Sequence, residues 1–148
     1  MSEELKKDVR ISVSGTVLEQ GEKNEPLTFI TDGRLYKKSG QYFLRYKESE
    51  LTGLSGTSTT IKASGDTVSV IRTGKYPSQM FFTVGEKRMA LYDTGFGGLT
   101  VVVNTKKIEN GLCDSGGDIN VLYEVEVENT PAYLNRLQVK VEEKRVNA

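Results

Sequence analysis

The side chains best suited to chemistry in this sequence are carboxylates, arginines and tyrosines, because the chain contains no histidine. Glu48 and Glu50 follow Tyr46 at steps of two residues, and Arg72 follows two valines at the same step. Side chains two residues apart on a strand point to the same face. The spacing therefore predicts that two acids and one guanidinium continue apolar faces into the interior of a sheet.

Three further polar residues join these candidates. Tyr123 lies among valines at two-residue steps, Thr105 follows two valines in the same way, and Tyr92 completes the group. Buried polar groups need partners, so a polar interior of this kind is a candidate ligand-binding site. The full candidate set is Tyr46, Glu48, Glu50, Arg72, Tyr92, Thr105 and Tyr123.

Three interpretations of this polar interior are open. In a structural one, Glu48 or Glu50 forms an ion pair with Arg72, and the tyrosines close the network near one end of the fold. In a binding one, Arg72 and the tyrosines contact polar groups of a mostly apolar ligand. In a catalytic one, the two glutamates, about 6.5–7 Å apart by strand rise, act as acid and base on a glycosidic bond.

We favour a non-enzymatic protein that binds a small amphipathic molecule in its interior, and we assign no catalytic residue, metal ligand or cofactor. The alternative from another class is a protein-interaction module whose interior is filled by its own side chains. A carboxylate-based enzyme is the third hypothesis. The volume of the interior distinguishes the ligand-binding hypothesis from the interaction-module hypothesis, since a small barrel either is filled by its own side chains or holds one ligand.

The composition narrows the expected partners and compartment. Lys and Arg total 20, as do Asp and Glu, so the net charge is zero and the field typical of nucleic-acid or membrane binding is not expected. Cys113 is the single cysteine, which argues against an intramolecular disulfide and a multi-cysteine zinc site. The N-terminus lacks an apolar signal segment, and no apolar run approaches about 20 residues. These features predict a cytoplasmic protein with no nucleic-acid or membrane partner.

Period-two alternation runs through most of the chain and predicts β-strands, most clearly over 121–127. Glycine, asparagine and aspartate separate these runs at intervals of about 8–12 residues, as hairpin turns require. The pattern predicts an all-β closed antiparallel barrel of roughly 8–10 strands, with a β-sandwich as the alternative. We expect one domain over 1–148, a frayed N-terminus over 1–6, and a bulge at Asp32-Gly33 inside a long strand.

An ordered set of short motifs covers nearly the whole chain. It begins with Tyr46-Lys47-Glu48-Ser49 and 56–60, and continues through Arg72-Thr73-Gly74, Met80-Phe81-Phe82, Tyr92-Asp93-Thr94, Gly98, Thr105, Gly116-Gly117 and Tyr123. In this order the motifs resemble the YwiB-like family of bacterial proteins, a domain of unknown function with a calycin-like (lipocalin-like) β-barrel. The resemblance implies a barrel fold and a bacterial cytoplasmic origin. It brings no activity, substrate or catalytic residue.

Overall fold

The computed structural model describes residues 5–18, 27–93, 98–128 and 132–144, with only the backbone described over 91–93 and 98–99. This part of the chain contains ten strands, one 3-10 turn and no α-helix. The elements are β1 (Leu5–Leu18), β2 (Leu27–Lys38), β3 (Gln41–Lys47), η1 (Glu50–Thr52), β4 (Thr57–Ser64), β5 (Thr67–Gly74), β6 (Ser78–Thr83), β7 (Lys87–Asp93), β8 (Gly98–Asn110), β9 (Gly116–Val127) and β10 (Tyr133–Glu143).

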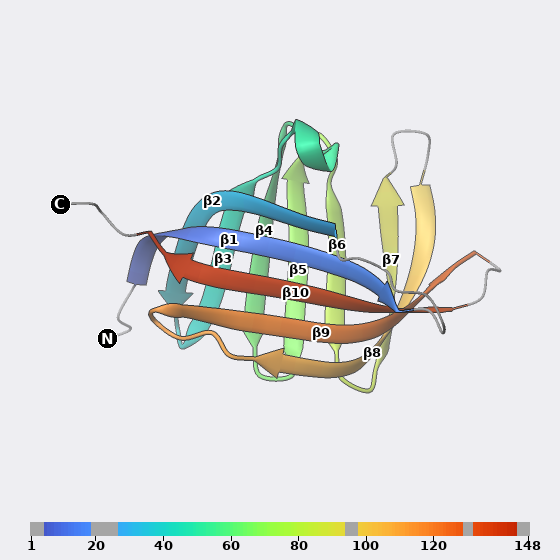
Figure 1. The fold of residues 1–148 in the computed structure, drawn as a ribbon. Coiled ribbons are helices and arrows are strands. Elements are labelled where there is room, and N and C mark those ends of the chain that lie inside the picture. Colours follow the sequence, from blue (N-terminus) through green and yellow to red (C-terminus); the bar gives the residue numbers. More distant parts are fainter. Residues whose placement is uncertain (1–4, 19–26, 94–97, 129–131, 145–148) are drawn as a thin grey trace.

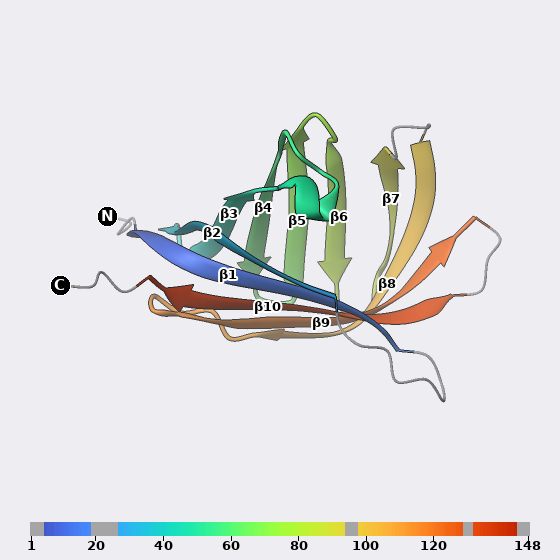
Figure 2. The same ribbon diagram turned by 45° about the horizontal axis from the view of Figure 1, so that its top comes forward.

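The strands form a closed barrel in which each pairs with its neighbours in sequence and β10 pairs with β1 (Figures 1 and 2). All of these pairings are antiparallel. An up-and-down barrel is what strands joined by short turns favour, because closure removes sheet edges. The predicted barrel is therefore confirmed, and the sandwich alternative is wrong.

Strand β1 begins at Leu5, so residues 5 and 6 of the segment that was expected to fray are part of the barrel. Leu5 lies opposite Lys37 and Lys6 lies opposite Tyr36 in the β1–β2 ladder. Leu5 also packs against the core, and the partial burial of its side chain stabilises this pairing. Residues 1–4 of the predicted segment lie outside the described residues.

The expected bulge at Asp32-Gly33 is wrong, although the pair does lie inside a long strand. The ladders run in unbroken register, with Gly33 opposite Val9 on one side and Tyr46 on the other. A Cβ atom on Gly33 would lie 2.6 Å from the Arg45 carbonyl oxygen and 2.6 Å from Cδ1 of Ile11. Glycine is required here because two neighbours approach the backbone closely.

The interior is layered in rows of residues that face each other across the strands. One row is Leu44, Ile61, Val70 and Met80, and a second is Tyr42, Ala63, Val68 and Phe82. These rows belong to the apolar core, which fills this part of the barrel with side chains. On the other side of the Leu44 row, the next row is polar and consists of Tyr46, Thr59, Arg72 and Ser78.

The ladder is thinnest between β6 and β7. Within the described residues, a single pairing, Ser78 with Tyr92, joins these two strands. Met89 on β7 is 73% exposed, and it lines a surface hollow of about 440 Å³ together with Ala90 and Arg72. The barrel is thus closed with one weak seam.

No helix in the described part of the chain is long and apolar enough to span a membrane.

Candidate functional site

One end of the barrel contains a cavity of about 650 Å³. The strands β1, β2, β3, β5, β9 and β10 contribute to its wall, and so does the segment around η1 (Figures 1 and 2). Its lining residues include Val13, Leu27, Phe29, Tyr46, Glu48, Leu51, Leu54, Arg72, Tyr123, Asn135 and Leu137. The cavity therefore combines apolar walls with four of the seven residues that the sequence singled out.

Tyr46, Thr59 and Arg72 face each other on β3, β4 and β5, so the regular ladder brings them together. Glu48 lies one residue beyond β3, yet its backbone N–H donates to the Thr57 carbonyl at 2.8 Å. That bond extends the β3–β4 pairing and keeps the Glu48 side chain on the inner face. The predicted parity of Tyr46, Glu48 and Arg72 is confirmed.

The charged pair at the centre of the site is loose. Nε of Arg72 lies 3.9 Å from Oε1 of Glu48, with the side chains 24% and 4% exposed. The same Oε1 accepts a 2.6 Å hydrogen bond from the Thr59 hydroxyl. At 3.9 Å the two charges attract each other but do not form a hydrogen bond.

Two buried polar atoms have no hydrogen-bond partner among the described residues, Nε of Arg72 and Oγ1 of Thr105. An unsatisfied buried donor is costly, and each instance in a native fold calls for an explanation. Arg72 lines the cavity, so a hydrogen-bond acceptor inside the cavity would satisfy its Nε–H.

Tyr46 is neutral throughout the physiological pH range. Burial raises the pKa of its hydroxyl well above the usual value, and the neighbouring Glu48 charge raises this pKa further. The hydroxyl therefore keeps its proton, which it can donate to the Glu48 carboxylate.

Glu50 does not belong to the site, which corrects the sequence-based assignment. Strand β3 ends at Lys47, and the Ser49 side chain caps η1 by accepting a hydrogen bond from Leu51 N–H at 3.2 Å. Glu50 is the first residue of this turn and is exposed, so its parity with Glu48 is lost. Glu48 therefore lines the cavity, whereas Glu50 is exposed and does not line it.

Of the remaining candidates Tyr123, Thr105 and Tyr92, the structure places only Tyr123 in the cavity wall. Tyr123 lines the cavity and packs edge-on against Phe82, with ring centroids 4.7 Å apart. Thr105 lies opposite Tyr123 in the β8–β9 ladder and is buried, but it does not line the cavity. Its strand carries a bulge between Thr105 and Lys107. The side chain of Tyr92 lies outside the described residues, although its backbone pairs with Ser78.

Sequence reasoning missed Thr59 and the leucines around η1. Thr59 shares two-residue parity with Ile61 and Ala63, and that signal could have placed it inside. Leu51 is 82% exposed at the rim, and Leu54 also lines the cavity. Their place follows from the 3-10 turn, for which the alternation gave no signal. No group of three or more acidic, cysteine or histidine side chains in the described segments could hold a metal ion.

Comparison with known proteins gives one consistent result. Residues 11–139 match the family described as a domain of unknown function, DUF1934. The chain is similar to the uncharacterized β-barrel protein YwiB of Bacillus subtilis strain 168, with 28% identity over 127 residues that cover 86% of this chain and 88% of that protein. The crystal structure of YwiB from Bacillus subtilis superimposes with a TM-score of 0.82 and 26% identity, covering 95% of this chain and 94% of the other. The resemblance seen in the sequence motifs is thereby confirmed.

Proposed function

The chain belongs to the family of the domain of unknown function DUF1934, and from its barrel geometry we propose that it binds a small amphipathic molecule in the cavity at the open end. The observation that carries this proposal is the buried Nε of Arg72, which has no acceptor among the described residues and belongs to a residue of the cavity wall. An apolar cavity that holds one unsatisfied cationic donor has the composition of a ligand site.

The size of the cavity supports a ligand of modest dimensions. Ligand sites commonly enclose about 300–1,000 Å³, and this cavity has about 650 Å³. Val13, Phe29 and Leu137 supply apolar wall, while the rows around Leu44 fill the rest of the barrel. The ligand's apolar part would lie against these walls at the open end.

The polar end of the ligand would be an anionic group such as a carboxylate. Arg72 cannot lose its charge, and Glu48 at 3.9 Å leaves its Nε–H unsatisfied. A ligand oxygen at hydrogen-bond distance from Nε would complete the guanidinium. The Tyr46 hydroxyl, which interacts with Glu48 in this structure, would offer a second donor by turning to the ligand. A cationic head group would instead face Arg72 with a like charge.

The two rival interpretations account for less of this site. A purely structural ion pair explains the burial of Glu48 but leaves the Arg72 donor unmet. An interaction module with a filled barrel agrees with the apolar rows but not with the cavity beside them. We also propose that the barrel is related to those of calycins and lipocalins, which hold a ligand in the mouth of the barrel. A bacterial cytoplasmic location is part of the same proposal.

The test uses 8-anilinonaphthalene-1-sulfonate, a fluorescent amphipathic anion, followed by displacement with three twelve-carbon competitors. Dodecanoate should displace the probe best, dodecanol less well, and dodecyltrimethylammonium least. Arg72→Gln should weaken dodecanoate binding about tenfold or more, since a hydrogen bond to a charged group contributes about 1.5–3 kcal/mol. Arg136→Gln, an exposed change outside the cavity, is the matched control.

Two results would refute the proposal. One is equal displacement by the cationic and anionic competitors, and the other is unchanged dodecanoate affinity in folded Arg72→Gln protein. Tyr46→Phe provides a second variant if Arg72→Gln fails to fold, because it removes only a hydroxyl. Circular dichroism at the binding temperature checks that each variant is folded.

A further inference from the structure

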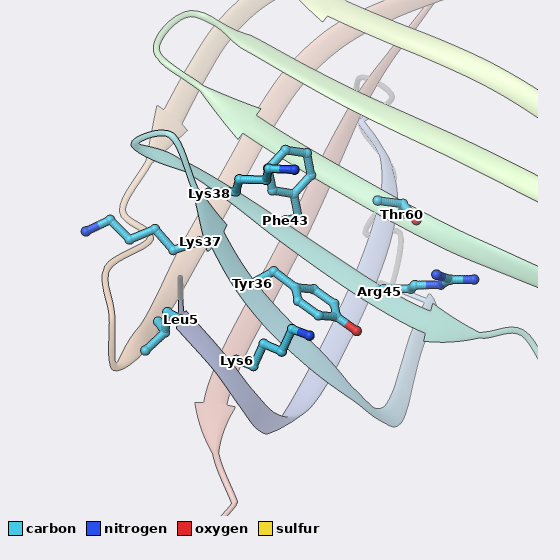
Figure 3. Close-up of a pocket in the computed structure, with 8 residues that line it drawn as sticks. All are labelled: Leu5, Lys6, Tyr36, Lys37, Lys38, Phe43, Arg45 and Thr60. Carbon is cyan, nitrogen blue, oxygen red and sulfur yellow. The ribbon is translucent and has the colours of Figure 1, made fainter. Parts of the chain in front are cut away.

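A second hollow, of about 500 Å³, lies on the outside of the barrel, away from the ligand cavity. It is lined by Leu5, Lys6, Tyr36, Lys37, Lys38, Phe43, Arg45 and Thr60 (Figure 3). These residues come from β1, β2, β3 and β4. Four of the eight are cations and none is acidic.

Two aromatic rings form the middle of this surface. Tyr36 on β2 and Phe43 on β3 are directly opposite each other in the ladder, and both are half-buried. Lys6 lies opposite Tyr36, with its ammonium 6.0 Å from the ring centroid, and Lys62 lies opposite Phe43 at 5.7 Å. A row of cation, ring, ring and cation therefore crosses four strands, and cation–π attraction accounts for its order.

Two more cations flank this row, Lys38 and Arg45, and both are exposed. Among the described residues, no carboxylate lies within 4 Å of Lys6, Lys38, Arg45 or Lys62. Lys37 differs, because it pairs with Asp114 at 3.3 Å and extends in the opposite direction from Tyr36 (Figure 3). The surface is thus locally basic although the chain as a whole is neutral.

From this arrangement we infer that the outer face of β1–β4 binds single-stranded nucleic acid. Aromatic rings on a sheet stack unpaired bases, and the surrounding Lys and Arg side chains neutralise the phosphates. The cations span three inter-strand steps, about 14 Å. That width fits a chain carrying several phosphates better than a single nucleotide, and an acidic peptide would make no use of the paired rings.

This inference reverses an expectation drawn from the net charge, which gave no weight to how charges are distributed locally. Lys6, Lys38, Arg45 and Lys62 are at least seven positions apart in the sequence and together form no basic run. The β1–β2, β2–β3 and β3–β4 ladders bring them together on one face.

Fluorescence anisotropy with fluorescein-labelled twelve-nucleotide oligo(U) and oligo(dT), at 50 mM and higher salt, tests the inference. The triple variant Lys38→Gln, Arg45→Gln, Lys62→Gln should flatten the slope of log affinity against log salt by about 2, since each phosphate contact contributes about 0.7. The control triple Lys87→Gln, Arg136→Gln, Lys140→Gln removes the same residue types from exposed sites on β7 and β10 and should not change the slope.

The aromatic rings need a separate variant. Tyr36→Leu with Phe43→Leu keeps the surface apolar but removes the stacking platform, and should weaken binding about tenfold. If this variant unfolds, the lysine–arginine triple still decides, because its side chains lie on the outside of the barrel. A difference between oligo(U) and oligo(dT) would identify RNA or DNA as the preferred partner, and equal affinity would support recognition of the chemistry that they share.

Three results in direct binding would overturn the inference: no binding at about 100 μM protein, equal loss in the control triple, or unchanged affinity in the folded aromatic variant. Oligoglutamate of equal charge is the competitor that distinguishes an acidic protein partner. If it displaces the oligonucleotide as well as unlabelled oligo(U) does, the surface recognises charge alone and the nucleic-acid assignment is wrong.

Discussion

The ion pair between Arg72 and Glu48 makes a sharp prediction about stability. Arg72→Leu leaves the Glu48 carboxylate buried, 4% exposed, with the Thr59 hydroxyl as its hydrogen-bond donor. At 3.9 Å and an effective dielectric constant of about 20, the lost attraction is about 4 kcal/mol. Breaking a buried pair costs about 3–5 kcal/mol, and the partial exposure of Arg72 favours the lower end.

The double variant Arg72→Leu with Glu48→Leu removes both charges, and should regain about 2 kcal/mol of that loss, because no buried charge is then left without its partner. Urea unfolding followed by circular dichroism measures the free energy of each variant, with equal m-values as the condition for comparison. The whole cycle then yields the coupling energy between the two side chains.

Lys107 and Glu109 provide a matched control. Their charged atoms are closer, at 3.1 Å, but the side chains are 67% and 61% exposed. Solvent screens such a pair, so the same leucine cycle should give a coupling below about 1 kcal/mol. If the Arg72 and Glu48 losses add within about 0.5 kcal/mol, or if the exposed pair couples more strongly, the two side chains do not form a stabilising buried pair.

Gly33, Tyr46 and Cys113 can each be tested by a change in stability. Gly33→Ala should lower the free energy of unfolding by about 1–3 kcal/mol through overpacking. Gly15→Ala is the control and should change this free energy little, because nothing lies within 4 Å of the new Cβ. Urea unfolding of both variants measures the difference. The pKa of Tyr46 is raised on folding, so above about pH 10 the unfolded chain binds fewer protons than the folded one. The melting temperature should therefore fall above that pH. Tyr46→Phe should reduce this fall in a pH series of melting temperatures. Dithiothreitol should leave the melting temperature unchanged because Cys113 is the single cysteine. EDTA should also leave it unchanged, because the described residues contain no group of three or more possible metal ligands. A drop in the melting temperature with either reagent would contradict this prediction.

The barrel could be read from the sequence because alternation, turn residues and inner-face parity all agree. Tyr46 and Arg72 were placed correctly because both lie inside strands, where the period is fixed at two. Glu48 followed because one hydrogen bond beyond β3 preserves that period. Glu50 failed for the converse reason, since the Ser49 cap starts a turn with a different geometry.

Other features depend on how the strands align with one another, and two-residue parity does not predict this alignment. Thr105 has the right parity, yet its position along β8 sets it away from the cavity wall. The rings of Tyr36 and Phe43 meet through the register of β2 and β3, which the sequence leaves open. Gly33 was interpreted as a bulge because glycine within a strand has two meanings, and close backbone approach was the correct one.

The weak seam between β6 and β7 changes which strands count as the ends of the sheet. Strands β1 and β10, the first and last in the chain, are joined by a long ladder from Val9–Glu143 to Leu18–Leu134. Strands β6 and β7 lie mid-chain and share one pairing within the described residues. Opened between β6 and β7, the closed barrel would be a ten-strand ribbon that starts at β7 and finishes at β6. A circular permutant opened at Gly85, between these strands, would therefore follow the natural order of the ribbon.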